Sequence, residues 1–281
     1  MEQHQNKTLN PRVTELEEAL KALAAGVRVN DEFPSGQVGK YQIERILGCH
    51  GQAVVIQATD PDLDRTVALK IYHSAISGQH RKRMINEGRA LARIESPNVA
   101  NCFGVEEFDE CVFLVNEFIE GETLRTCLDN ELLTVEEKIE VLSQLALGLN
   151  DIHGVGLLHR DLKPENIVIT PQGRTKIIDF GLVGPMDSND VPDHDSSGTP
   201  AYMAPERPRA DHKNTDQRSD IFSVGAILYE MLTGSPPFES PSNTKSRQLA
   251  SSNEFESLSD DIQSTPSGRL CMECLLSLIH I

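Results

Sequence analysis

The hydrophobic period of the sequence becomes mainly helical near Gly121, and this change constrains the fold more than any other feature. Before it, the first three apolar runs are separated by short connections, which is typical of strands joined in an antiparallel meander. After it, apolar residues recur at helical spacing. The sequence therefore predicts an α+β protein with a small antiparallel sheet followed by a larger helical part. The predicted strands cover residues 41–47, 53–59, 66–71, 102–107 and 112–118, with one main helix at 80–94.

The helical part has two well-marked helices. Thr134 and Glu137 form a capping box at the start of the first. The second, at 216–233, is apolar nearly all round, so we expect it in the middle of a core. Residues 240–267 are rich in Ser, Asn, Thr and Asp and predict a loop or disorder. The first helix carries an apolar stripe of Ile139, Leu142, Leu145, Leu149 and Ile152.

Charge and composition exclude several classes of protein. The 26 basic and 43 acidic residues give a net charge of −17. This balance argues against a nucleic-acid or anionic-membrane partner, because both need a basic face. The chain lacks an apolar run of roughly 18 residues or more, so no membrane span is expected. Without a signal peptide or a disulfide framework, the expected location is cytoplasmic. We interpret the lone Cys271–Cys274 pair as chance spacing, since a structural zinc needs about four ligands.

Residues 1–40 are predicted to be a leader that precedes the main domain. Thr14 and Glu17 form a second capping box, followed by apolar residues at helical spacing. We expect a short amphipathic helix that packs on the domain behind it. Docking of this helix to a partner is the alternative.

Four motifs appear in order along the main domain. His159 to Asn166 reads HRDLKPEN and lies between a predicted helix and a short strand at 167–169. Asp179-Phe180-Gly181 follows a predicted strand at 175–178, and Gly198 to Glu206 reads GTPAYMAPE. Lys70 lies in a VALK run on the third strand. In this order and context, the motifs resemble the eukaryotic-like serine/threonine protein kinases, particularly the bacterial branch.

The resemblance implies a two-lobed protein-kinase fold over residues 41–281. The first lobe would cover about 41–120 and the second about 121–281, with clear resemblance from Tyr41 to about Phe238. The family's further helices and a pairing arginine are not evident after Phe238, so a C-terminally truncated chain is expected. The form of the segment from Gly198 to Glu206 indicates a protein rather than a small-molecule substrate.

The resemblance also implies transfer of the ATP γ-phosphate to Ser or Thr hydroxyls of protein substrates. The transferred group carries spread negative charge, so catalysis consists of positioning and electrostatic stabilisation. Asp161 would accept the proton of the substrate hydroxyl, and Lys163 would contact the γ-phosphate. Lys70 would bind the α and β phosphates, held by Glu87. Thr199 would tether the catalytic loop and favour Ser or Thr substrates. A dimer that supports autophosphorylation is a further expectation.

The same resemblance predicts how ATP and Mg²⁺ are bound. Asn166 and Asp179 offer the oxygen ligands that Mg²⁺ requires. Two of the adenine contacts would be backbone groups of Glu117 and Ile119. Asp220 would anchor the backbone of the catalytic loop, and His159 is expected to be a core residue. The remaining nucleotide contacts would come from Leu47, Gly48, Gly51, Val55, Ala68 and Val168.

Two departures from the family pattern leave alternatives open. The glycine loop has His50 and Ala53 where the family has glycine, and glycine lets backbone N–H groups approach phosphate closely. A pseudokinase or scaffold with weak nucleotide binding is therefore the alternative function. In the activation segment, either Asp193 acts as a built-in anion for Arg160, or Ser196 or Ser197 is phosphorylated.

Overall fold

The computed structural model describes residues 36–50, 53–72, 85–86, 88–108, 111–179, 184–185, 199–208 and 216–275. The chain divides into two compact units, of which unit 1 comprises 1–92 with 101–118 and unit 2 comprises 93–100 with 119–281. Several predictions fall outside the described residues: the leader helix, Gly51, Glu87, Phe180 and the stretch 191–198. The helix expected at 80–94 is described only in part.

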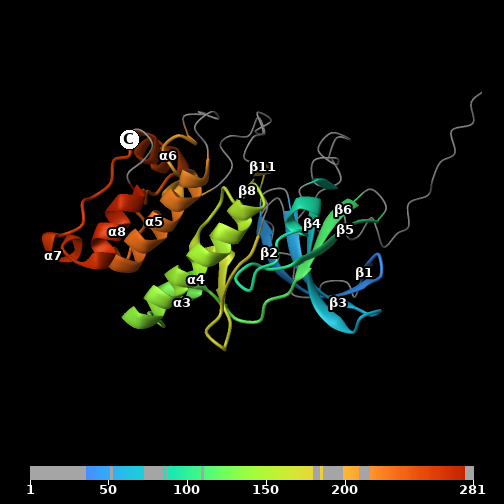
Figure 1. The fold of residues 1–281 in the computed structure, drawn as a ribbon. Helices are drawn as coiled ribbons and strands as arrows, with labels where there is room; N and C mark the ends of the chain where they lie inside the picture. The colour runs from blue at the N-terminus through green and yellow to red at the C-terminus, as the bar shows by residue number, and fades with distance from the viewer. Residues whose placement is uncertain are drawn as a thin grey trace, which may run out of the picture. The chain divides into compact units, whose positions relative to one another are not determined.

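Unit 1 is built on an antiparallel sheet with the strand order β1-β2-β3-β4-β6-β5 in the described residues (Figure 1). All five predicted strands are confirmed, with ends that differ by no more than three residues. The antiparallel meander predicted for the first three strands is confirmed in β2, β3 and β4, and beyond it β6 lies between β4 and β5. The long connection after β4 lets the chain reach the far edge before it returns. The strands are β1 Gln37–Val38, β2 Tyr41–His50, β3 Ala53–Asp60, β4 Arg65–Tyr72, β5 Cys102–Phe108 and β6 Cys111–Glu117.

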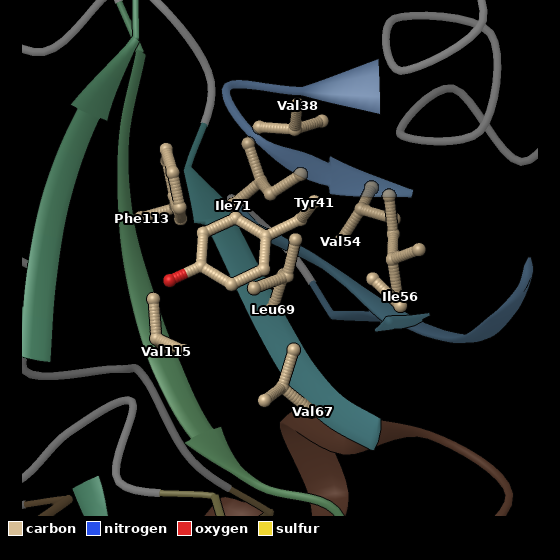
Figure 2. Packing of buried hydrophobic residues seen from close by; sticks show 10 residues of the cluster. Val38, Tyr41, Val54, Ile56, Val67, Leu69, Ile71, Phe113 and Val115 are labelled. Atoms are coloured by element: carbon tan, nitrogen blue, oxygen red, sulfur yellow. The ribbon is translucent and has the colours of Figure 1, made fainter. Parts of the chain in front are cut away.

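One face of this sheet carries the apolar core of unit 1 (Figure 2). The ring of Tyr41 meets Phe113 edge to face, with 6.0 Å between the ring centroids. Its hydroxyl donates to Glu106 Oε1 at 2.6 Å, so this polar atom is paired although the ring is buried. Burial of the ring, together with this bond, raises the pKa of Tyr41. The other members of the cluster are Val38, Val54, Ile56, Ala58, Val67, Leu69, Ile71 and Val115.

Unit 2 is organised around two long helices, α4 Val135–Gly154 and α5 Gln217–Thr233. They run antiparallel, because Lys138 near the start of α4 donates to Met231 O near the end of α5. Helix α8, Pro266–Leu275, packs on α5 (Figure 1). The sheet β7-β9-β10 and the pair β8-β11 complete the strands. Their bounds are β7 Glu122–Thr123, β8 Leu157–Leu158, β9 Ile167–Ile169, β10 Thr175–Ile177 and β11 Gly184–Pro185.

The capping box at the start of α4 is confirmed, with Thr134 and Glu137 each accepting from the other's backbone N–H. The apolar stripe predicted on this helix is wrong at its first position, since Ile139 is 54% exposed. On α4 the first fully buried residue is Val141. The short helices of unit 2 are α3 Leu124–Asp129, η1 Pro164–Asn166 and η2 Pro200–Tyr202.

The prediction of loop or disorder at 240–267 is also wrong. This stretch contains α6, Asn243–Ser252, α7, Asp260–Gln263, and the start of α8. Ser242 caps α6 by accepting from the N–H of Lys245, and Asn253 ends it in the left-handed conformation. The helix is polar because it buries only Ser246 and Ala250, so it leaves little apolar periodicity to detect. Within the described residues, no helix is both long and apolar enough to cross a membrane.

Candidate active site

The sheet of unit 1 places the predicted nucleotide-binding residues on the face opposite its core. Successive strand residues point to opposite faces. Since the core takes Val54 and Ile56 from β3 and Val67, Leu69 and Ile71 from β4, the residues between them face away. These residues are Val55, Ala68 and Lys70, and Val55 pairs directly with Lys70 across the two strands.

Lys70 is 5% exposed, although its side chain carries a charge. Burial of an ammonium group costs free energy unless the group is paired with an anion or an acceptor. The burial of Lys70 is therefore a feature that a role of its charge would explain. Leu114 and Asn116 of β6 pair with Lys70 and Ala68 and lie on the same face. Among the described residues, the amide oxygen of Asn116 is buried and accepts no hydrogen bond.

The glycine-loop segment forms a hairpin between β2 and β3. The strands are paired as far as His50 and Ala53, so only two residues connect them. The pairing shifts between Ile46 and Gly48, which bends β2 just where Leu47 becomes exposed. The sequence departures His50 and Ala53 are thus the last paired residues of the hairpin.

In unit 2, Lys163 and Thr199 lie around the carboxylate of Asp161, which belongs to the predicted catalytic loop at 159–166. Asp161 Oδ1 accepts from the backbone N–H of Thr199 at 3.1 Å. Lys163 Nζ lies 3.2 Å from Asp161 Oδ2 and donates to Thr199 Oγ1 at 3.0 Å. The tether predicted for Thr199 is therefore present in both its backbone and its side chain.

Asn166 is held against the same loop. It is 2% exposed, and its Nδ2 donates to Asp161 O at 2.8 Å. The amide oxygen consequently points away from Asp161. The N–H of Ile178 donates to Asn166 O at 2.8 Å, which brings Asp179, the next residue, beside Asn166. Two oxygen-bearing side chains of the kind that bind Mg²⁺ thus come from neighbouring backbone segments.

Two residues of this region adopt a backbone conformation that non-glycine residues rarely take. The φ angles are +67° at Arg160 and +61° at Asp179. Such conformations cost roughly 1–3 kcal/mol each, so they persist only where surrounding contacts hold them. For Arg160 the contacts are explicit, since Asp220 of α5 accepts from the N–H of both His159 and Arg160.

The predicted anchoring role of Asp220 fits these bonds. Burial alone would raise its pKa, but the bonds from His153, Arg160 and His159 together hold the pKa of Asp220 below its usual range. His159 is fully buried, and burial lowers its pKa. A buried histidine that stays neutral agrees with the expected core role.

The profile of the protein kinase domain matches residues 41–279. The chain belongs to the protein kinase family. The match extends past Phe238, through the segment that contains α6, α7 and α8.

Several bacterial serine/threonine-protein kinases are similar to this chain. "Serine/threonine-protein kinase pkn3" of Myxococcus xanthus is 36% identical over 227 residues, which cover 75% of this chain and 41% of the relative. "Probable serine/threonine-protein kinase PknB" of Bifidobacterium longum is 34% identical over 215 residues, covering 71% and 31%. "Serine/threonine-protein kinase PrkC" of Bacillus subtilis is 33% identical over 208 residues, covering 73% and 32%. The chain thus spans less than half the length of these relatives. The resemblance to the bacterial serine/threonine branch is confirmed, and nothing in these comparisons favours a pseudokinase.

One cluster of this kinase domain escaped the sequence analysis. Tyr202, three residues after Thr199, donates its hydroxyl to Glu230 Oε2 at 2.8 Å, and Arg125 of α3 binds the other oxygen of Glu230. Burial raises the pKa of both Tyr202 and Glu230. The cluster joins η2, which contains Tyr202, to α3 and α5. Its members lie up to 105 positions apart, so no local pattern could have revealed it.

Two further buried side chains are bonded to α5. Glu206 Oε1 accepts a hydrogen bond from the Ser219 hydroxyl. Cys271 is buried, and its thiol donates to Gly225 O on α5. No group of three or more His, Cys, Asp and Glu side chains suited to a metal ion occurs within the described residues.

Proposed function

We propose that this kinase transfers the γ-phosphate of Mg²⁺-bound ATP to Ser or Thr hydroxyls of protein substrates. The arrangement of Lys163 and Thr199 around Asp161 is the observation that supports it most strongly. Thr199 directs its N–H at one oxygen of the carboxylate, and Lys163 approaches the other. The carboxylate is thereby oriented to accept a hydroxyl proton, while the ammonium group lies next to it to stabilise charge on the transferred phosphoryl group.

The metal and the nucleotide are assigned to named residues in this proposal. Protein kinases use ATP with a divalent metal ion, and we take that ion to be Mg²⁺. The amide oxygen of Asn166 and the carboxylate of Asp179 would hold it, because both are hard oxygen ligands. The bound metal would neutralise charge on the phosphates. Lys70 would bind the α and β phosphates, with Glu87 as its partner.

The remaining nucleotide contacts follow the same proposal. Glu117 would offer its carbonyl to the adenine, because its N–H already donates to Asn101 O at 2.8 Å. Ile119 would offer its N–H. The residues proposed to contact the base, the sugar and the phosphates are Leu47, Gly48, Gly51, Val55, Ala68 and Val168.

We also propose the broader setting of the activity. The kinase domain would cover residues 41–281 and follow the leader at 1–40. The boundary between its two lobes in the sequence would fall near residue 120. A cytoplasmic location is supported by the thiols of Cys102, Cys127, Cys271 and Cys274, which are free. A dimer would allow autophosphorylation. The identity of the protein substrate is left to experiment.

Replacement of Asp161 by Asn tests the function. Transfer of labelled phosphate from ATP to a generic Ser/Thr protein is expected to fall by about two orders of magnitude or more, since general acid–base groups contribute that much. ATP binding, measured by calorimetry, is expected to stay unchanged. Asp129→Asn is the matched control, because Asp129 lies on the exposed side of α3. Activity of Asp161→Asn equal to that of the control contradicts the proposal.

A further inference from the structure

One side chain on the nucleotide-binding face of unit 1 carries a buried amide oxygen that lacks a hydrogen-bond donor. Phe113 and Val115 of β6 point into the apolar core (Figure 2), so Asn116 lies on the opposite face of the sheet. Its Oδ1 is shielded from solvent, and the described residues place no donor within reach of it. Such a group costs free energy in a folded protein, because nothing replaces the water that it has lost.

The neighbours of Asn116 across the sheet do not supply that donor. On β4 it pairs with Ala68, whose methyl group carries none. On β5 it pairs with Cys102, whose thiol is directed at Gly104 O with 3.7 Å between sulfur and oxygen. A molecule bound on this face can supply it instead.

Asn116 also lies where the base of the nucleotide is expected. Lys70, proposed to bind the phosphates, is two residues from Ala68 along β4, a distance of about 7 Å. Asn116 pairs with Ala68 and directly precedes Glu117, whose carbonyl is proposed to face the adenine. This face of the sheet thus offers a cation at one end and hydrogen-bond acceptors at the other.

The 6-amino group of adenine fits a pair of acceptors, because its nitrogen carries two hydrogens. The carbonyl of Glu117 would accept one of them, and the second needs an acceptor of its own when the base leaves water. We propose that Oδ1 of Asn116 accepts this second hydrogen, which makes Asn116 a residue that determines specificity for a 6-aminopurine nucleotide. The inference rests on the proposed function, because it takes ATP as the nucleotide.

The test removes the amide from the protein and the amino group from the nucleotide, separately and together. Asn116→Leu keeps a side chain of similar size without an acceptor. Purine riboside triphosphate is ATP without its 6-amino group. Calorimetry gives the Kd of both Mg²⁺-bound nucleotides for both full-length chains. The bond to the Glu117 carbonyl is lost with the amino group in either chain, so the comparison isolates the contribution of Asn116.

Gln57→Leu is the matched control, because it replaces another amide on the same face by leucine. Gln57 of β3 pairs with Ala68 from the other side. Its amide is already bonded, since Oε1 accepts from Arg45 and Nε2 donates to Glu44. Its replacement is expected to change the Kd of either nucleotide by no more than about twofold.

For Asn116→Leu, the Kd of ATP is expected to rise about tenfold, the factor that corresponds to one buried hydrogen bond. The Kd of purine riboside triphosphate is expected to stay within about twofold. Without nucleotide, the melting temperature of Asn116→Leu is expected to equal or exceed that of the unmodified chain, because the substitution removes a buried acceptor that the described residues leave unpaired. A purely structural role of the amide would lower it.

The inference is overturned if Asn116→Leu weakens both nucleotides by the same factor, as a bridging water or an altered shape of the site would produce. It is also overturned if neither Kd changes, if the nucleotide-free variant melts below the unmodified chain, or if Gln57→Leu weakens ATP just as selectively. Binding of ATP without phosphate transfer by the unmodified chain contradicts the proposed function alone, since the four Kd values still decide the role of Asn116. An unmodified chain that binds neither nucleotide contradicts both.

Discussion

Replacement of Asp220 by Asn exchanges one carboxylate oxygen for an amide nitrogen, at a carboxylate that accepts from three donors. Asparagine has the same shape, but only one of its two terminal atoms accepts hydrogen bonds. If its nitrogen takes the place of Oδ2, it faces the donors of His153 and His159. If the amide is flipped, the nitrogen faces only the N–H of Arg160. The flipped orientation is preferred, and at least one of the three bonds is lost.

The cost of this loss can be worked out from the three contacts. A buried donor left without its charged acceptor costs about 1.5–3 kcal/mol. The two remaining bonds lose the assistance of charge, which roughly halves their strength. Together these effects predict a loss of about 2–4 kcal/mol in the free energy of unfolding. For a chain of this size the melting temperature falls by about 2–4 °C for each kcal/mol, so we expect a decrease of roughly 5–15 °C.

Thermal unfolding at pH 7, followed by circular dichroism, measures this shift. Asp216→Asn is the matched control, because Asp216 caps the same helix, α5, and asparagine caps a helix equally well. Only a small change is expected there. Destabilisation of Asp220→Asn no greater than that of the control would refute the argument that the three bonds hold the loop.

Acidification gives the same argument a second test. The pKa of Asp220 is lower in the folded state than in the unfolded chain. Its charged form therefore stabilises the fold fully above about pH 4, and this contribution is lost as the pH falls through the folded-state value. The unmodified chain is expected to exceed Asp220→Asn in free energy of unfolding by the whole predicted amount at pH 7. In acid this difference is expected to become smaller. A difference that grows on acidification would contradict the assigned direction.

Three further predictions concern other parts of the domain. Tyr202→Phe removes the hydroxyl bonded to Glu230 and is expected to cost about 1–3 kcal/mol of stability, measured by thermal unfolding, because it leaves a buried carboxylate oxygen with one donor fewer. Gly225→Ala is expected to cost about 1–3 kcal/mol by urea denaturation, since the added Cβ would lie 2.7 Å from Cys274 Cβ; unchanged stability would mean that α8 does not pack closely on α5. Lys70→Met is expected to abolish phosphate transfer without unfolding the sheet, and near-normal transfer would exclude the role proposed for this residue.

Much of the fold could be predicted because its signals are local. The strands of unit 1 follow from alternating apolar residues, and the start of α4 follows from Thr134 and Glu137, three positions apart. The position of β6 in the sheet could not be predicted. Strand order depends on how the long connection after β4 folds, and no pairing pattern within a single strand records that.

The polar helix α6 could not be predicted from the sequence, because its local signals are weak. Its capping residues, Ser242 and Asn253, are the kind that helix ends favour, but a helix that buries two small residues gives almost no hydrophobic period. The prediction that Ile139 of α4 belongs to a packed apolar stripe was wrong for a related reason. It fits the apolar spacing, yet the tertiary structure covers the helix only from Val141 onward.

The sequence by itself determined which residues are available for the chemistry proposed for this chain. Phosphoryl transfer needs particular residue types at fixed short spacings, and Asp161, Lys163 and Asn166 meet that need within six positions. Only the tertiary structure decided how those side chains are held. The bonds of Asp220 to residues 60 to 67 positions away form because α4 and α5 pack antiparallel, and helix packing depends on contacts between distant residues.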